Sequence, residues 1–219
     1  MTVDLRLNAI VDPERANGRD LAELARLCAQ GGATLIQLRD KRGDTGAMVE
    51  TARAIKQALA PFGTAFVIND RVDVALAAGA DGVHIGPEDM AVADARRLLG
   101  PHAIIGLSIK SAAEAETVPV DLIDYVGSGG VYATLSKEQK KPPIGPQGLA
   151  RIIDAIKRRK REMPVCGIAG VDATNAAEVI AAGADGVAVI SALSLAPDPA
   201  AAARTLRGIV DATLAKRGA

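Results

Sequence analysis

Short apolar runs alternate along the chain with longer stretches whose apolar residues recur every three or four positions. The short runs are typical of buried strands, and the longer periodic stretches are typical of amphipathic helices. The pattern predicts strands at residues 7–11, 35–38, 65–68, 83–85, 104–107, 125–127, 165–168 and 187–190. It predicts a helix after each strand; the third, near 72–78, is short, and the last runs from Pro199 to about Lys216.

Eight strands alternating with eight helices predict a parallel sheet, because each crossover between parallel strands needs a helix. Eight such units in 219 residues favour an α/β fold that closes into a single (β/α)8 TIM barrel, at the small end of its size range. An open doubly wound sheet is the alternative. No internal linker is apparent, so we expect one domain over residues 1–219.

The heptapeptide AAGADGV occurs twice, at residues 77–83 and 181–187. It predicts a joint between a helix and a strand, in which Gly79 and Gly183 take a left-handed conformation that ends the helix. The Asp-Gly pair then turns the chain into a short apolar strand. The copies precede strands four and eight, which face each other across a barrel, so we expect the same joint in both halves.

Composition narrows the class of protein. The 26 basic and 26 acidic residues cancel, and the chain has no Trp, two Tyr and two Phe. We therefore expect neither nucleic acid nor a membrane surface as a partner. The first residues show no signal peptide, and no apolar run could span a bilayer, so a cytoplasmic protein is expected. Cys28 and Cys166 lack metal-ligand spacing, and two buried thiols are favoured over a disulfide.

In a barrel, the chemistry lies where the strands end and the following loops begin. The second strand ends in the sequence QLRDK. Because side chains alternate along a strand, Gln37 and Arg39 point the same way, and with Lys41 they form a positively charged rim at the barrel mouth. A solvated loop is the simpler alternative, but Gln37 directly follows an apolar run.

Two carboxylates follow adjacent strands. Asn69 and Asp70 end the third strand, and Asp89 lies just beyond the fourth. Each aspartate alone is more often a helix cap. Together, Asp70 and Asp89 predict an oxygen-ligand site for Mg²⁺, which commonly also binds substrate phosphate. His84 is expected in the barrel wall and not as a ligand, and His102 at the surface of the opposite end.

Further polar residues follow strands five and six. Ser108 places a hydroxyl at the mouth, and the long segment after strand six contains Thr134, Ser136 and Lys137. This segment is rich in Gly, Pro and Lys, which is typical of a lid. Residues 136–148 are predicted to be mobile without ligand and ordered when pyrophosphate is bound. Lysines on such a lid suit a polyphosphate that must be enclosed.

The loops after strands seven and eight suit a phosphate cradle. Gly170 allows close backbone approach, and Ile190 and Ser191 add donors. The mouth would then hold two phosphorylated ligands, one of them a metal-bound pyrophosphate. No Ser-His-Asp or Cys-His set is evident, so the chemistry is expected to rely on charge stabilisation of a leaving group.

Six motifs together resemble thiamine-phosphate synthase: QLRDK, INDRVDVALAAGADGVHIG-x-ED, GLS, DYVGSG-x-VYATLSK, PVCGIAGV and GADGVAVISAL. The resemblance extends from about Ala9 to Pro199. It implies an enzyme, a transferase that joins a pyrimidinylmethyl pyrophosphate to a thiazole phosphate. The products are thiamine phosphate and pyrophosphate. Pyrophosphate would leave first, and the thiazole nitrogen would capture the resulting cation.

The resemblance also implies a role for each candidate residue. The pyrimidine pyrophosphate would be held by Gln37, Arg39, Lys41 and Asn69, and Mg²⁺ by Asp70 and Asp89. Ser108 would contact the pyrimidine amino group, and Lys137 would stabilise the departing pyrophosphate. Thr134 would bind the thiazole side, and Gly170, Ile190 and Ser191 would hold the thiazole phosphate. Ser136 is also expected to bind substrate. Arg39, Ser108 and Lys137 would be the catalytic residues.

Five positions depart from the family's usual residues. Pro87 stands in place of Gln, Gly130 and Ala133 in place of Pro, Ser136 in place of Thr, and Ala169 in place of Gly. These changes bear on the loop conformation and the phosphate geometry, not on the metal site.

Three alternatives remain open. A thiazole tautomerase on the same barrel binds a thiazole phosphate but needs no residues for Mg²⁺ and pyrophosphate. Residues of that kind are present here: Arg39, Asp70, Asp89 and Lys137. A sugar-phosphate epimerase would need a pair of bases or metal-binding histidines, which His84 alone does not supply. A non-catalytic phosphate-binding protein is the third. A homo-oligomer is compatible with the sequence.

Overall fold

Eight parallel strands close into a barrel in the order in which they occur along the chain, with β8 pairing back onto β1. The structure is a computed structural model that describes residues 3–134, 136 and 142–218. The strands are β1 (Leu7–Val11), β2 (Leu35–Leu38), β3 (Ala65–Asn69), β4 (Gly82–Ile85), β5 (Ile104–Ile109), β6 (Tyr125–Ser128), β7 (Val165–Ile168) and β8 (Gly186–Val189). The predicted TIM barrel is confirmed, and the open sheet is excluded.

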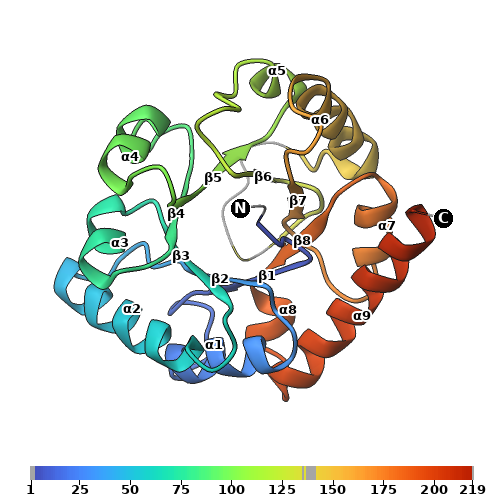
Figure 1. Ribbon diagram of the computed structural model, residues 1–219. Coiled ribbons are helices and arrows are strands. Elements are labelled where there is room, and N and C mark those ends of the chain that lie inside the picture. The colour runs from blue at the N-terminus through green and yellow to red at the C-terminus, as the bar shows by residue number, and fades with distance from the viewer. Residues whose placement is uncertain (1–2, 135, 137–141, 219) are drawn as a thin grey trace.

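The helices form a ring around the strands (Figure 1). They are α1 (Leu21–Gln30), α2 (Thr45–Leu59), α3 (Val72–Ala78), α4 (Val92–Leu99), α5 (Ala112–Ala115), α6 (Gly145–Arg159), α7 (Ala176–Ala181), α8 (Ser191–Ser194) and α9 (Pro199–Arg217). The sequence predicted one helix after each strand. The described chain has a second short helix after β8, because α8 forms between that strand and the long terminal α9.

Two apolar layers stabilise the barrel. The larger lies between the strands and the helices and includes Leu24, Ile55 and Leu149 from α1, α2 and α6. The smaller fills the inside of the barrel and includes Leu5, Leu35 and Val67. Alternating strand residues point to the two layers, so most strands carry apolar residues on both faces. This explains the continuous apolar runs in the sequence.

The repeated heptapeptide is the same joint in both halves of the barrel. Gly79 has φ 65° and Gly183 has φ 107°, the left-handed conformations predicted for the helix ends. The aspartates of the two copies have the same role as well. Asp81 accepts a hydrogen bond from the backbone N–H of Phe66 at 2.8 Å, and Asp185 accepts one from Val165 at 2.9 Å. Each carboxylate therefore ties its own joint to the start of the preceding strand.

This tie recurs before every even-numbered strand. Before β2 and β6, Leu7 N–H donates to Thr34 Oγ1 at 3.1 Å and Ile105 N–H donates to Asp124 Oδ2 at 2.8 Å. The three aspartates also pair with a basic side chain of α2, α4 or α6, namely Lys56, Arg96 and Lys157. The repeat in the sequence thus reflects four repeated joints in the barrel.

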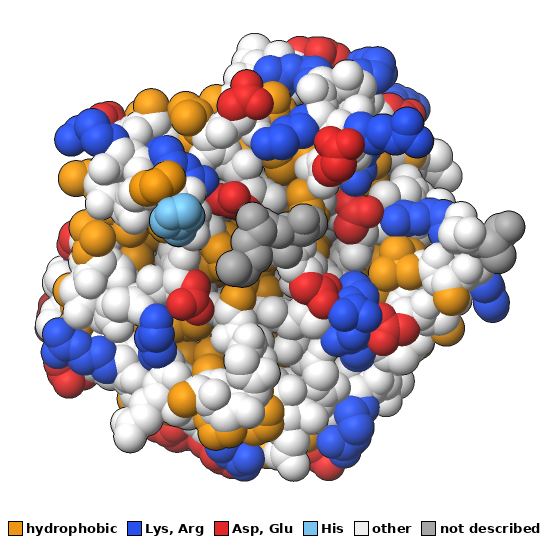
Figure 2. Space-filling view, in the orientation of Figure 1, with side chains coloured by type: hydrophobic (Ala, Val, Ile, Leu, Met, Phe, Trp, Pro, Cys, Tyr) orange, Lys and Arg blue, Asp and Glu red, His pale blue; other side chains and the backbone are white. Residues whose placement is uncertain are grey.

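Charges of both signs are interspersed over the face seen in Figure 2, in agreement with the balanced composition. Within the described part of the chain, no helix is long and apolar enough to cross a bilayer.

Candidate active site

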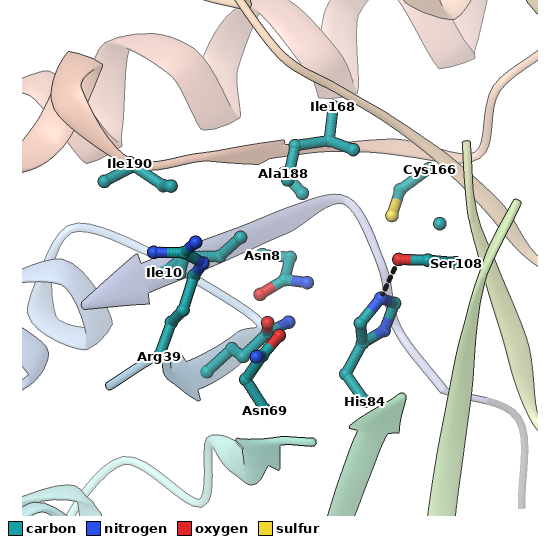
Figure 3. A pocket seen from close by; sticks show the side chains of 12 residues that line it. Asn8, Ile10, Arg39, Asn69, His84, Ser108, Cys166, Ile168, Ala188 and Ile190 are labelled. Atoms are coloured by element: carbon teal, nitrogen blue, oxygen red, sulfur yellow. Dashed lines mark hydrogen bonds between the residues drawn. The ribbon is translucent and has the colours of Figure 1, made fainter. Parts of the chain in front are cut away.

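Inward-facing residues on or directly after all eight strands line one pocket. Figure 3 shows its side chains. Five of the predicted site residues lie in its wall: Gln37, Arg39, Asn69, Ser108 and Ile190. The wall is completed by seven residues that sequence reasoning did not assign to a site: Asn8, Ile10, His84, Gly127, Cys166, Ile168 and Ala188. The barrel therefore brings together residues separated by most of the chain.

Arg39 has a partner that the sequence did not suggest. Its guanidinium forms an ion pair with the carboxylate of Asp12, which follows β1. Asp12 is 1% exposed, so Arg39 is held by a buried anion. A bidentate or buried guanidinium partner fixes the direction of the remaining donors. Arg39 is thereby oriented at the pocket before any ligand binds.

Lys41, Asp70 and Asp89 meet beside the pocket. The Lys41 ammonium forms an ion pair with Asp70, and Asp89 Oδ2 accepts a hydrogen bond from Gly86 N–H at 2.7 Å. Burial raises the pKa of the Asp70 carboxyl; the ion pair with Lys41 lowers it and the carboxyl of Asp89 raises it again, leaving it above its ordinary value. Two carboxyl groups thus lie close together at the mouth of the barrel.

The helix-cap alternative for these aspartates is wrong. The N-cap of α3 is Arg71 and that of α4 is Ala91, and neither makes a side-chain cap hydrogen bond. Asp70 instead has a left-handed backbone, with φ 63°, and its N–H donates to the His84 carbonyl at 2.8 Å. Aspartate tolerates this conformation better than most residues, but it remains uncommon and is enriched at functional sites.

His84 links a buried tyrosine to the pocket. Its Nδ1 lies 2.8 Å from the Tyr125 hydroxyl and its Nε2 lies 2.8 Å from Ser108 Oγ (Figure 3 shows the second contact). Burial raises the pKa of Tyr125 well above its ordinary value, so the hydroxyl keeps its proton. The prediction that His84 lies in the barrel wall is confirmed. The structure adds that it positions the Ser108 hydroxyl.

Two strand glycines make room for this pair of rings. A Cβ at Gly106 would lie 2.1 Å from Tyr125 Cζ and 2.5 Å from His84 Nδ1, and one at Gly127 would lie 2.9 Å from His84 Cε1. Glycine inside a strand is a recognised sign of close approach. Gly106 and Gly127 were therefore the features of the sequence from which a bulky pair of side chains at this place could have been predicted.

The loops after β6, β7 and β8 meet on the other side of the mouth. Ser136 N–H donates to Thr134 Oγ1 at 3.1 Å, and the hydroxyls of Ser136 and Ser191 are 3.3 Å apart. Gly170 has φ 64°, and a Cβ there would lie 2.3 Å from the Ala133 carbonyl oxygen. Ser191 is the first residue of α8. The predicted thiazole-side residues are therefore brought together across three loops.

The departures from the family pattern affect the backbone here. Gly130 has φ 79°, which proline cannot adopt because its ring fixes φ near −65°. Ala169 has φ 89°, a conformation that favours glycine. At Gly130 the loop after β6 therefore has a shape that proline would not allow, whereas Ala169 keeps the left-handed backbone that the family's usual glycine favours.

One predicted catalytic residue, Lys137, lies outside the described residues, as do Lys140 and Lys141. The predicted lid over residues 136–148 is too long at its far end, because α6 begins at Gly145. Pro146 lies in the first turn of α6, where proline is favourable.

Among the described residues, no group of three or more His, Cys, Asp or Glu side chains could hold a metal ion. Asp70 and Asp89 are a pair only. Both cysteines are free and buried, so the disulfide alternative is excluded. Burial raises the pKa of Cys28 and of Cys166 to about 12, so both thiols stay protonated.

The comparison with known families gives a match over most of the barrel. The family described as "Thiamine monophosphate synthase" matches residues 7–193. The chain belongs to the thiamine-phosphate synthase family. It is therefore a transferase that condenses a pyrimidine with a thiazole moiety and releases pyrophosphate.

Individual relatives agree with this family over nearly their whole length. The thiamine-phosphate synthase of Agrobacterium fabrum is 49% identical over 98% of this chain and 98% of its own, and that of Moorella thermoacetica is 47% identical over 93% and 95%. The solved thiamine phosphate pyrophosphorylase of Pyrococcus furiosus has a TM-score of 0.85 and 38% identity, covering 97% of this chain and 98% of its own. These relatives favour the synthase over the tautomerase and epimerase alternatives.

Proposed function

We propose that the mouth of the barrel holds two anions at separate places, the pyrophosphate of the pyrimidine substrate and the phosphate of the thiazole substrate. The observation that carries this proposal is the meeting of Lys41, Asp70 and Asp89 beside the pocket, away from the Ser136–Ser191 contact. The pyrophosphate side comprises Gln37, Arg39, Lys41, Asn69, Asp70, Asp89 and Lys137. The thiazole side comprises Thr134, Ser136, Gly170, Ile190 and Ser191.

The residues on the pyrophosphate side fit a bound Mg²⁺. Asp70 and Asp89 provide hard oxygen atoms. Burial, and then the neighbouring carboxyl of Asp89, raise the pKa of Asp70, a cost that a divalent cation would offset. Mg²⁺ usually takes one or two protein carboxylates and completes its shell with water and substrate phosphate. The pair of carboxylates, with no third His, Cys, Asp or Glu side chain grouped with them among the described residues, agrees with that preference.

When bound, the ion would neutralise charge that develops on the departing pyrophosphate. The protein's own cations would act on the same charge. Arg39, fixed by Asp12, directs its free donors at the pyrophosphate, and Lys41 exchanges Asp70 for a phosphate oxygen. Lys137 would stabilise the leaving oxygen as the C–O bond breaks. Donors aimed at developing charge stabilise the transition state more than the ground state.

The remaining pocket residues would hold the pyrimidine. Ser108, positioned by His84, contacts the ring's polar edge, while Ile10, Ile168 and Ala188 form an apolar wall. Such a wall excludes water, which would otherwise capture the pyrimidine cation in place of the thiazole nitrogen.

Two substitutions test the division of the mouth. Lys137→Ala should lower kcat by about two to three orders of magnitude, the cost of losing one oxyanion donor, with little change in KM for the thiazole phosphate. Ser191→Ala should raise the thiazole KM and reduce kcat less. Steady-state kinetics with each substrate varied in turn distinguish the two. If Lys137→Ala raises only the thiazole KM and leaves kcat intact, the proposed division is wrong.

A further inference from the structure

We propose that Asn8 recognises the amino-bearing edge of the pyrimidine substrate, an inference that rests on the proposed function. Asn8 lies on β1 and is 1% exposed. Its Oδ1 is fully buried and has no hydrogen-bond partner in the protein. All residues that line the pocket belong to the described part of the chain, and among them only Asn8 has a buried side-chain polar atom without a hydrogen-bond partner.

The fold gives this side chain no structural partner. The backbone of Asn8 lies in register with Leu35 of β2 and Ala188 of β8. Its side chain points into the barrel, in the middle of the pocket, with Arg39 and Asn69 to one side and His84 to the other (Figure 3). A buried amide oxygen without a partner is costly, and such groups in native proteins commonly serve a ligand.

Because Asn8 Oδ1 is a hydrogen-bond acceptor, it limits which ligand groups can bind to it. An amide oxygen accepts hydrogen bonds, so its partner must carry an N–H or O–H. Phosphate oxygens are acceptors, and a thiazole ring with carbon substituents has no N–H. The amino group of the pyrimidine is the donor among the polar groups of the two substrates. The free acceptor therefore matches the pyrimidine and neither of the two anions.

An asparagine amide also suits the neighbouring ring nitrogen. An amino group beside a ring nitrogen presents a donor and an acceptor side by side, as adenine does, and asparagine binds adenine through both of its amide atoms. Asn8 has the matching pair, Oδ1 and Nδ2. Arg39 pairs with Asp12 and Ser108 contacts His84, whereas the Asn8 oxygen is the pocket atom that is buried without a partner. Asn8 is thus a specificity-determining residue at the floor of the pocket.

The test measures binding of two ligands: the aminopyrimidine pyrophosphate and its analogue without the amino group. Calorimetry with Mg²⁺ and without the thiazole substrate gives a Kd for each. The natural protein should bind the amino compound about 10- to 100-fold more tightly, the range expected for satisfying a buried acceptor. Asn8→Leu, of similar size and without polar atoms, should abolish most of this preference while melting at the same or a higher temperature.

Ser128→Ala is the matched control. Ser128 also has a buried oxygen without a partner, but it does not line the pocket. This variant should keep the full preference for the amino compound. Asn8→Ala replaces Asn8→Leu if leucine is not accommodated. Full discrimination by a folded Asn8 variant would overturn the proposal. The proposed division of the mouth is tested separately by the kinetics of Lys137→Ala and Ser191→Ala, so the two failures are distinguishable.

Discussion

Arg39 and Lys41 at the mouth of the barrel each form an ion pair with an aspartate, and the two pairs differ in how deeply they are buried. Arg39 and Asp12 have side chains that are 17% and 1% exposed, whereas Lys41 and Asp70 are 45% and 18% exposed. A buried guanidinium–carboxylate pair is costly to break, while an exposed ammonium exchanges partners readily. We therefore expect Arg39 to be a fixed donor and Lys41 a movable one. Substrate binding would change the partner of Lys41 and leave that of Arg39 unchanged.

Tyr125→Phe tests whether the hydroxyl behind His84 matters to the reaction. The substitution removes a hydrogen bond that orients the imidazole, which in turn contacts Ser108. We expect kcat/KM for the pyrimidine substrate to fall about tenfold and the free energy of unfolding to fall by ~1 kcal/mol. Steady-state kinetics and denaturant unfolding measure the two effects.

Tyr132→Phe is the control for this change. It removes the same group, but the Tyr132 hydroxyl donates to Glu178 at 2.9 Å at the exposed edge of α7. Its kinetics should stay near those of the natural protein. Kinetics of Tyr125→Phe that equal those of Tyr132→Phe would show that the contact with His84 has no part in catalysis.

At the residue scale, the sequence predicted the donors at the mouth but not the residues behind them. Gln37, Arg39, Asn69 and Ser108 end apolar runs, so their polarity stands out. Asp12 also follows an apolar strand, yet its partner Arg39 is 27 positions away. Such pairs depend on strand register, which one sequence does not specify. Asn8 is the second residue of β1 and Tyr125 is the first of β6, and at such positions alternation alone does not distinguish a pocket residue from a core residue.

At the scale of elements, the four joints before the even-numbered strands make the same kind of hydrogen bond. A carboxylate or hydroxyl accepts a hydrogen bond from the first residues of the preceding strand. These joints lie at the end of the barrel opposite the pocket. In TIM barrels, this end serves stability and the other end serves catalysis. The two tasks can therefore be separated by mutation.

Asp185→Ala should test that separation. Asp185 accepts from Val165 N–H and from Lys157 at 2.9 Å each, and it also pairs with Arg217. Its loss leaves a strand N–H without a partner, so the free energy of unfolding should fall by about 1–3 kcal/mol. The kinetic constants should remain unchanged well below the melting temperature. Denaturant unfolding and steady-state kinetics give both values.

Glu50→Ala is the control for this substitution. Glu50 pairs with Arg53 one turn away on the exposed surface of α2. Exposed pairs of this kind contribute little, so its free energy of unfolding should change by no more than about 0.5 kcal/mol. Equal effects of the two substitutions would contradict a special role for the joint.

The strands and long helices were predictable because their apolar periods are short and repeated. Three strands, β1, β2 and β7, have the bounds that the pattern predicts. β8 is shifted by one residue, and the other four differ by one or two residues at one end. The helix α8 was missed because four residues are too few to show a helical period. The start of α6 was missed because its two glycines and one proline are more typical of a loop.

At the scale of the whole molecule, the two halves of the barrel have different tasks in the proposed reaction. The pyrophosphate side is built mainly on the ends of β2, β3 and β4, and the thiazole side on the loops after β6, β7 and β8. The pocket lies between them, lined by all eight strands. In this proposal, closure of the sheet would bring the two substrates face to face, since an open sheet would hold its first and last strands apart.

The measurement that tests this account most directly is product formation from both substrates as a function of Mg²⁺. The purified protein should release thiamine phosphate and pyrophosphate in equal amounts, lose this activity when the metal is chelated and regain it when Mg²⁺ is restored. Asp70→Asn should lose most of the activity and melt near the natural temperature, because asparagine also tolerates the left-handed backbone at this position. Equal rates with and without Mg²⁺, or full activity of Asp70→Asn in the absence of metal, would contradict it.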